Sequence, residues 1–95
     1  MADFLFLMHD DTTATVDATA WPRYFLQLGE RFQGGSSIGT GVTVRRDQDP
    51  PVLTAHLAGY IRVIAADLTE ARALVAGNPV FEAGGTVEVR ELPRD

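Results

Sequence analysis

The alternation of apolar and polar residues divides the chain into four extended segments and two helical ones. The first segment, Asp3–His9, is apolar at odd and even positions alike, so both of its faces require cover. Residues 38–46 and Leu57–Ala65 follow as two further strands, and Thr86–Leu92 alternates as the last one. Asp47–Pro51 ends in two prolines, which cannot sit inside a ladder, and it therefore separates the two middle strands.

The first helix is predicted from apolar residues that recur at spacings of three and four. Pro22 is tolerated in the first turn of a helix, where its missing N–H is not needed, so the helix should begin near Thr19–Trp21. We expect Gly34-Gly35 to end it. Its apolar stripe consists of Trp21, Tyr24, Phe25, Leu28 and Phe32.

The second helix carries clear start and stop signals. Asp67 can accept from the N–H groups of the first turn, and Glu70 can reach back to complete a capping box. Gly77 and Pro79 end the helix, and the connection from Asn78 to Gly85 has room for one more helical turn. The predicted inward stripe consists of Leu68, Ala71, Leu74 and Val75.

The resulting order, β-α-β-β-α-β, predicts an α+β fold of the ferredoxin-like type. Such a chain closes as an antiparallel four-stranded sheet with both helices on one face. The other face stays bare, although Tyr60 and Ile64 point there and the first strand is apolar on that side too. A second copy, packed sheet against sheet across a two-fold axis, is the simplest cover, so we predict a homodimer.

Composition narrows the class of protein. The 95 residues suffice for one domain, and the absence of cysteine excludes disulfides, thiolate metal sites and cysteine nucleophiles. Eight basic against 13 acidic residues give a net charge of −5, which repels phosphate backbones, so we expect no nucleic-acid partner. The apolar run Phe4–Met8 is too short for a signal sequence or a membrane span, so we expect a cytoplasmic protein without a membrane partner.

Candidate chemistry gathers at one edge of the predicted sheet, where the first strand ends and the third begins. A histidine beside a carboxylate can act as a general acid or base near neutral pH, so His9, Asp10 and His56 are the candidate catalytic residues. An arginine nearby could hold a carboxylate substrate. The candidate ligand-binding residues are Trp21, Arg46, Asp49, Tyr60 and Arg62.

These residues also have simpler interpretations. His9 could be a solvated turn residue, and His56 could merely begin a strand. We expect no metal, because the spacing of an established ligand set is missing, and no cofactor. Gly39-Thr40-Gly41 lies inside an alternating segment rather than between a strand and a helix, so it does not qualify as a phosphate-binding loop.

Three runs of the sequence together resemble the YCII-related, DGPF-domain family: His56–Tyr60, Asp67–Ala71 and Asn78–Arg90. The opening strand, which ends at Met8-His9, is also similar. The resemblance implies a dimeric α/β barrel of ferredoxin-like protomers. The motif that names the family belongs in the hairpin between the second and third strands, where this chain has Asp47–Pro51 instead. A first-helix histidine, which some members pair with an aspartate in acid–base chemistry, is also missing.

Two functional hypotheses follow. The first is a dimeric small-molecule-binding or accessory domain without established catalysis. The second is a lyase- or isomerase-like enzyme acting on a small organic acid, with His9 or His56 as proton shuttle, oriented by Asp10 or Asp49, and with Arg46 as the anchor for the acid. We favour the first hypothesis because the chain departs from the family pattern at its motif and at the first-helix histidine.

Overall fold

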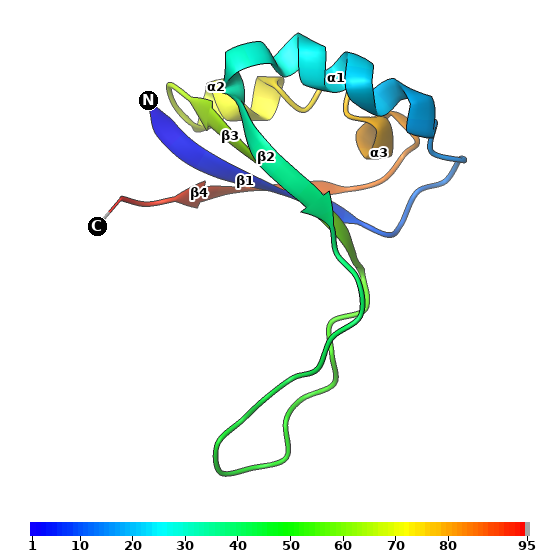
Figure 1. The fold of residues 1–95 in the computed structure, drawn as a ribbon, viewed down its shortest axis with the longest axis vertical. Helices are drawn as coiled ribbons and strands as arrows, with labels where there is room; N and C mark the ends of the chain where they lie inside the picture. Colours follow the sequence, from blue (N-terminus) through cyan, green and yellow to red (C-terminus); the bar gives the residue numbers. More distant parts are fainter. Residues whose placement is uncertain (95) are drawn as a thin grey trace.

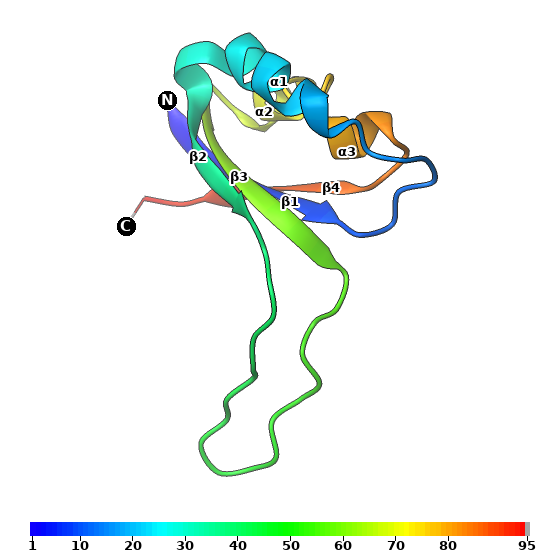
Figure 2. The same cartoon turned by 45° about the vertical axis from the view of Figure 1, so that its right-hand side comes forward.

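A four-stranded antiparallel sheet with the order β2-β3-β1-β4 forms the centre of the computed structural model, which describes residues 1–94. Three α-helices cover one face of it, as Figures 1 and 2 show. This arrangement confirms the predicted ferredoxin-like α+β fold. The strands are β1 (Ala2–His9), β2 (Phe32–Ser37), β3 (Leu57–Ala65) and β4 (Val87–Leu92); the helices are α1 (Trp21–Leu28), α2 (Leu68–Ala73) and α3 (Pro79–Glu82), and 3-10 turns η1 (Ala18–Ala20) and η2 (Gly29–Arg31) flank α1.

The core lies between the sheet and the helices. The central strand β1 turns Phe4, Phe6 and Met8 toward the helices, and these side chains are at most 4% exposed. In the β1–β3 register, Val63 stands beside Phe4 and Ile61 beside Phe6. Every second residue of these strands is therefore buried, as expected for a sheet with helices on one face. The helices and the turn after α2 complete the core with Tyr24, Leu28, Ala71, Val75 and Val80.

The opposite side of the sheet, here called the helix-free face, holds mixed side chains. Leu5 lies between Arg62 and Arg90 in the register, and Leu7 lies between Tyr60 and Glu88. Both leucines are only half-buried, and the helices in residues 1–94 all pack on the other side. As predicted, β1 is therefore apolar toward both faces, but charged neighbours flank its outer leucines.

The first helix begins where the sequence predicts but ends earlier. Asp17 accepts a hydrogen bond from the backbone N–H of Thr19 (3.0 Å) and caps η1, and Pro22 lies in the first turn of α1. The predicted end at Gly34-Gly35 is wrong. Gly29 ends α1 with a φ of 58°, a conformation that glycine adopts without strain, so Phe32 begins a strand.

The predicted second strand, residues 38–46, is also wrong: β2 is Phe32–Ser37. It pairs with β3 through Ser37 beside Gly59 and Gly35 beside Ile61, with an irregularity between Phe32 and Gly35. A Cβ on Gly35 would stand 2.5 Å from the carbonyl oxygen of Tyr60. Glycine is thus required there by a close approach of two backbones, which outweighs its low strand propensity.

The second helix begins with its predicted capping pattern, but the predicted end is wrong: α2 ends at Ala73, before Gly77, and Pro79 begins α3. The carboxylate of Asp67 accepts from the N–H of Glu70 (2.9 Å), and the carboxylate of Glu70 accepts from the N–H of Ala66 (3.2 Å). Ala71 and Val75 are buried and Leu74 packs against the core, as predicted. Leu68, however, is 56% exposed, since it stands at the first helical position and points away from the sheet's core.

Residues 38–56 leave the sheet as a long hairpin, here called the arm. The β2–β3 ladder ends at Ser37 and Gly59, and the N–H of Ile38 still donates to the carbonyl of Ala58 (3.0 Å). Beyond that bond the two sides of the arm separate, and Figure 1 shows it extending away from the helices. The radius of gyration of 14.7 Å exceeds the roughly 12 Å expected for a compact domain of this size, because the arm projects.

Tyr24 connects the two helical segments inside the core. Its hydroxyl donates to the backbone carbonyl of Leu74 (2.7 Å), and burial raises the pKa of Tyr24 to about 12, because the charged phenolate would be desolvated. The unfolded chain ionises this tyrosine from pH ~10. The stability that the neutral phenol contributes is therefore present below pH 10 and is lost as the pH rises from about 10 to 12.

We predict that Tyr24→Phe lowers the free energy of unfolding at pH 7 by about 1–2 kcal/mol, because the carbonyl of Leu74 loses its buried partner. The variant should also lose less stability than the wild type between pH 9 and pH ~11. Urea unfolding at several pH values measures both effects. Leu26→Ala, on the exposed outer side of α1, is the control and should leave both measurements unchanged.

Candidate functional site

The two histidines of the chain meet at the end of the sheet, as the predicted topology requires. The ring centroids of His9 and His56 are 4.9 Å apart in an edge-to-face arrangement. Nε2 of His9 lies 3.2 Å from Oε1 of Glu88, which projects from β4 on the helix-free face. The other carboxylate oxygen of Glu88 accepts from Arg90 at 3.0 Å. We call His9, His56, Glu88 and Arg90 the histidine cluster.

The carboxylate beside His9 is thus Glu88 rather than Asp10, the predicted partner. The backbone N–H of Asp10 donates to the carbonyl of His56 (2.7 Å), which ties the two strand ends together, while the residue itself is exposed. Adjacent residues in an extended chain point to opposite sides, so Asp10 diverges from His9. Glu88 reaches the ring because β4 lies directly beside β1.

Electrostatics keep Glu88 ionised. The hydrogen bond from Arg90, followed by the one from His9, lowers the pKa of Glu88 below its ordinary value. Asp11 has its own partners: its carboxylate accepts from the N–H of Thr86 (2.8 Å) and from the hydroxyl of Thr86 (2.6 Å), and these bonds lower its pKa. Asp11 therefore fixes the start of β4, while Glu88 is the carboxylate that can orient an imidazole.

Arg46 and Asp49 lie away from the histidines. Both belong to the arm and are exposed, and the nearest charged partner of Arg46 is Asp47, with Nε and Oδ1 3.9 Å apart. The prediction placed them beside His9 and His56 because it ended the second strand at residue 46. Since β2 ends at Ser37, nine positions earlier, the arm carries both residues beyond the edge of the sheet.

Tyr60 and Arg62 project from the helix-free face. Arg62 pairs with Asp3 (3.6 Å), and Arg94 pairs with the other oxygen of the same carboxylate (2.9 Å). These arginines, Arg94 foremost, lower the pKa of Asp3. Arg62, a candidate ligand-binding residue from the sequence, is therefore paired with a neighbouring carboxylate of its own chain. Tyr60 stands nearer the histidine end and is 37% exposed.

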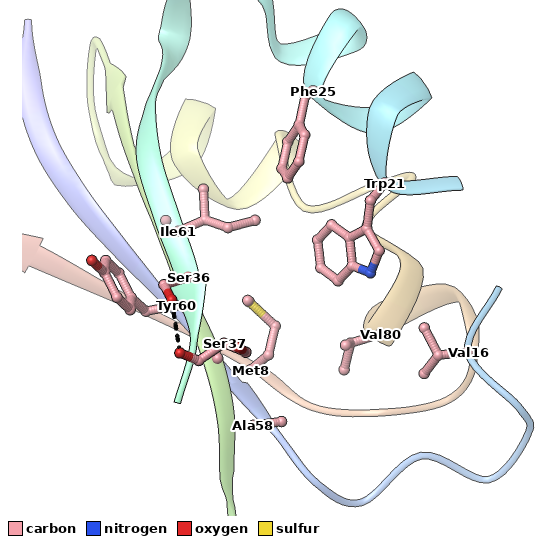
Figure 3. A pocket seen from close by; sticks show the side chains of 12 residues that line it. Met8, Val16, Trp21, Phe25, Ser36, Ser37, Ala58, Tyr60, Ile61 and Val80 are labelled. Carbon is pink, nitrogen blue, oxygen red and sulfur yellow. Dashed lines mark hydrogen bonds between the residues drawn. The ribbon is translucent and has the colours of Figure 1, made fainter. Parts of the chain in front are cut away.

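Trp21 lines a pocket on the opposite side of the sheet, between α1 and the strands. The cavity measures about 340 Å³. Figure 3 shows Trp21 and Phe25 descending from α1 toward Ile61 and Met8 of the sheet, with Val16 and Val80 at one side. Its polar groups are few: Ser36 and Ser37 stand at the strand edge, where the hydroxyl of Ser36 donates to the carbonyl of Ser37 (2.9 Å). We call this cavity the apolar pocket.

Aromatic stacking shapes the roof of the apolar pocket. The rings of Trp21 and Phe25 have centroids 5.7 Å apart, and Phe25 lies 4.5 Å from Phe32. This aromatic row fixes the orientation of the indole over the cavity. The side chain of Tyr60 points to the other face in Figure 3, so Tyr60 contributes to the pocket through its backbone edge.

The apolar pocket lies on the helix side of the sheet, under α1, with Phe25 and Met8 among its walls. The helix periodicity marked Phe25 as a core residue. The residues that could have indicated the cavity are Gly35 and Gly59. Both line the apolar pocket, and because they carry no side chains they leave space at its floor.

The comparisons with known proteins concern the fold. No protein-family model and no curated protein matches the sequence. Among solved structures, the chain is similar to 5-chloro-2-hydroxyhydroquinone dehydrochlorinase from Burkholderia phenoliruptrix AC1100, in complex with 2,5-dihydroxybenzoquinone. The TM-score is 0.64, with 18% sequence identity over 98% of this chain and 95% of the other. This likeness places the chain in the ferredoxin-like α+β class.

Two further observations describe residues 1–94. None of their helices is long and apolar enough to cross a bilayer. In the same part of the chain, no three side chains among His, Asp and Glu gather in a way that could hold a metal ion.

We predict that Arg90→Ala raises the pKa of Glu88 toward its ordinary value, because Arg90 is its strongest stabilising partner. His9→Ala should raise it by less. Carboxyl carbon NMR titration measures the change directly. Arg23→Ala, which removes an exposed arginine of α1, serves as the control; an unchanged titration of Glu88 in Arg90→Ala would contradict the proposed pairing.

Proposed function

We propose that this chain is a small-molecule-binding protein whose ligand occupies the apolar pocket, and that it belongs to the YCII-related, DGPF-domain family. The observation that carries the proposal is the cavity of about 340 Å³ under Trp21 and Phe25. Ligand sites are typically concave, mostly apolar and of roughly 300–1,000 Å³, with few polar groups. Met8, Ile61 and Val80 supply such walls, and the serines at the strand edge supply the polar groups.

The shape of the apolar pocket favours a flat ring as ligand. The indole of Trp21 offers an aromatic face, and aromatic rings gain from offset stacking on such a face. A cavity of about 150 Å³ already admits benzene, so a ring with one or two small polar substituents has room here. The structural neighbour was solved with 2,5-dihydroxybenzoquinone, a molecule of this class, which supports the choice of probe.

We predict that 2,5-dihydroxybenzoquinone binds saturably and quenches the fluorescence of Trp21, the single tryptophan of the chain. Val16→Asp should weaken this binding at least tenfold, because it brings a charge to the wall of an apolar site. Leu26→Asp makes a comparable change on the outer side of α1, where Leu26 is 82% exposed, and should leave affinity unchanged. Calorimetry checks the fluorescence result, and a wild-type protein that shows no saturation contradicts the proposal.

A second candidate function rests on the histidine cluster. Glu88 at 3.2 Å can orient the imidazole of His9, as general acid–base catalysis by a histidine requires. The name of the structural neighbour, a dehydrochlorinase, is compatible with a lyase-like reaction of a small organic acid. In NMR spectra, ligands of this second kind would shift the ring signals of His9 and His56, whereas ligands of the apolar pocket would shift the indole signal of Trp21.

The proposal includes a homodimer that buries the helix-free face. Leu5 and Leu7 are half-buried in the single chain and stand in the middle of that face. Two acidic residues, Asp3 and Glu88, and two basic residues, Arg62 and Arg90, surround these leucines. A two-fold axis brings such a face onto itself, so charges of opposite sign from the two copies would meet in addition to the pairs within each chain.

We predict that the wild-type chain sediments as a species of twice its 10.3 kDa mass at micromolar concentration. Leu7→Arg should weaken the dimer at least about 100-fold, because it buries an unpaired charge at the centre of the interface. Leu26→Arg, on the exposed side of α1, is the control and should sediment like the wild type. A monomeric wild type at these concentrations would contradict the homodimer.

A further inference from the structure

The arm exposes apolar side chains that its own protomer leaves uncovered. Val42, Val44 and Val52 are between 83% and 94% exposed, and Leu53 is 40% exposed. Exposed apolar residues are ordinary when scattered, but these four lie within 12 consecutive positions of one projecting hairpin. An apolar group of this kind indicates a surface that contacts another molecule.

The arm does not pair with itself as a ladder. Asp49-Pro50-Pro51 removes two backbone donors from one side, and the hydroxyl of Thr43 donates to the carbonyl of Pro51 across the gap. An isolated two-stranded ribbon is marginally stable in water even when it is fully paired. A structureless connection of this length is uncommon in a compact domain unless it has a binding role. Contact with another surface would therefore stabilise the conformation of the arm.

The direction of the arm identifies that surface. In Figures 1 and 2, which share their vertical axis, the helices lie above the sheet and the arm descends on the other side. A molecule seated on the helix-free face would therefore lie alongside the arm. The arm and that face are also continuous, because the arm leaves the sheet at Ser37 and returns at Leu57, beside the histidine cluster.

The size of the helix-free face shows why a flat contact is insufficient for a dimer. The four strands have six to nine residues, each rising about 3.3 Å, and lie about 4.8 Å apart, so the face covers roughly 450 Å². A stable interface buries about 800 Å² on each partner. The helix-free face alone supplies about half of that area, and two arms related by a two-fold axis would supply the rest.

We propose that residues 38–56 form an arm that clasps a second copy of this chain, with Val42, Val44 and Val52 packed on the partner. This inference rests on the homodimer of the proposed function and adds the element that holds it together. Both arms reach across, since an isologous dimer repeats every contact. The arm also carries Arg46 and Asp49 to the partner, which gives these residues a place at the interface.

The test compares dimer dissociation constants by sedimentation equilibrium. The triple variant Val42→Ser, Val44→Ser, Val52→Ser should weaken the dimer at least about 100-fold, because three buried apolar side chains are lost on each protomer. Leu26→Ser removes an equally exposed apolar residue from α1 and should leave the constant unchanged. Because the three valines are exposed in the single chain, the circular dichroism spectrum of the variant should match that of the wild type.

A photo-crosslinking residue at position 44 provides the second measurement. In a mixture of 14N- and 15N-labelled chains, the product should have twice the chain mass and join peptides of different isotope content. Two results would contradict the proposed role of the arm without contradicting the homodimer. The first is an unaltered dissociation constant in the triple variant, and the second is a dimer whose crosslinks all lie within single chains. A wild-type protein that is monomeric overturns both.

Discussion

The burial of one side of β1 is the constraint on which the rest of the structure depends. Phe4, Phe6 and Met8 are almost completely buried because the helices pack on them, and β1 is central, with β3 and β4 on its two sides. The period of two along a strand then decides where the intervening leucines go. Leu5 and Leu7 must emerge on the other face, among the arginines and carboxylates of the neighbouring strands. The covered side contains the apolar pocket, and the uncovered side contains the histidine cluster.

Much of the fold could be predicted from local signals because each signal has one physical meaning. Pro22 marks a first helical turn, and Asp67 with Glu70 marks a helix start; both are where the sequence places them. Phe32–Ser37 could not be predicted in the same way. Two glycines and two serines favour a loop, whereas in the structure the segment pairs with β3 and brings the backbones of Gly35 and Tyr60 too close for any side chain at position 35. The alternating residues 38–46 have the right pattern but lack a partner strand at their register.

The candidate site shows a similar division between local and long-range information. Topology alone brings His9 and His56 to the same end of the sheet, and their rings do meet. The acidic partner of His9 could not be predicted from residues close in sequence. Asp10 is adjacent to His9, but the partner is Glu88, which lies 79 positions away. Only the β1–β4 register, which pairs Leu7 with Glu88, brings that carboxylate within reach. Arg46 and Asp49 were predicted to lie near the histidines because the second strand was predicted to end at residue 46. Since β2 ends at Ser37, both residues lie on the arm instead.

In the proposed function, ligand binding and assembly use different faces of the sheet. A ligand in the apolar pocket would contact α1 and the inner side of the strands, while a partner copy on the helix-free face would contact the outer side. Met8 and Glu88 illustrate the separation, because Met8 lines the pocket and Glu88 faces the proposed partner. The sheet is a single layer, so a change in the twist of β1 would alter side-chain packing on both of its faces. Tyr60 lines the edge of the pocket with its backbone and places its ring on the opposite face, so this residue would adjoin both a bound ligand and the proposed partner.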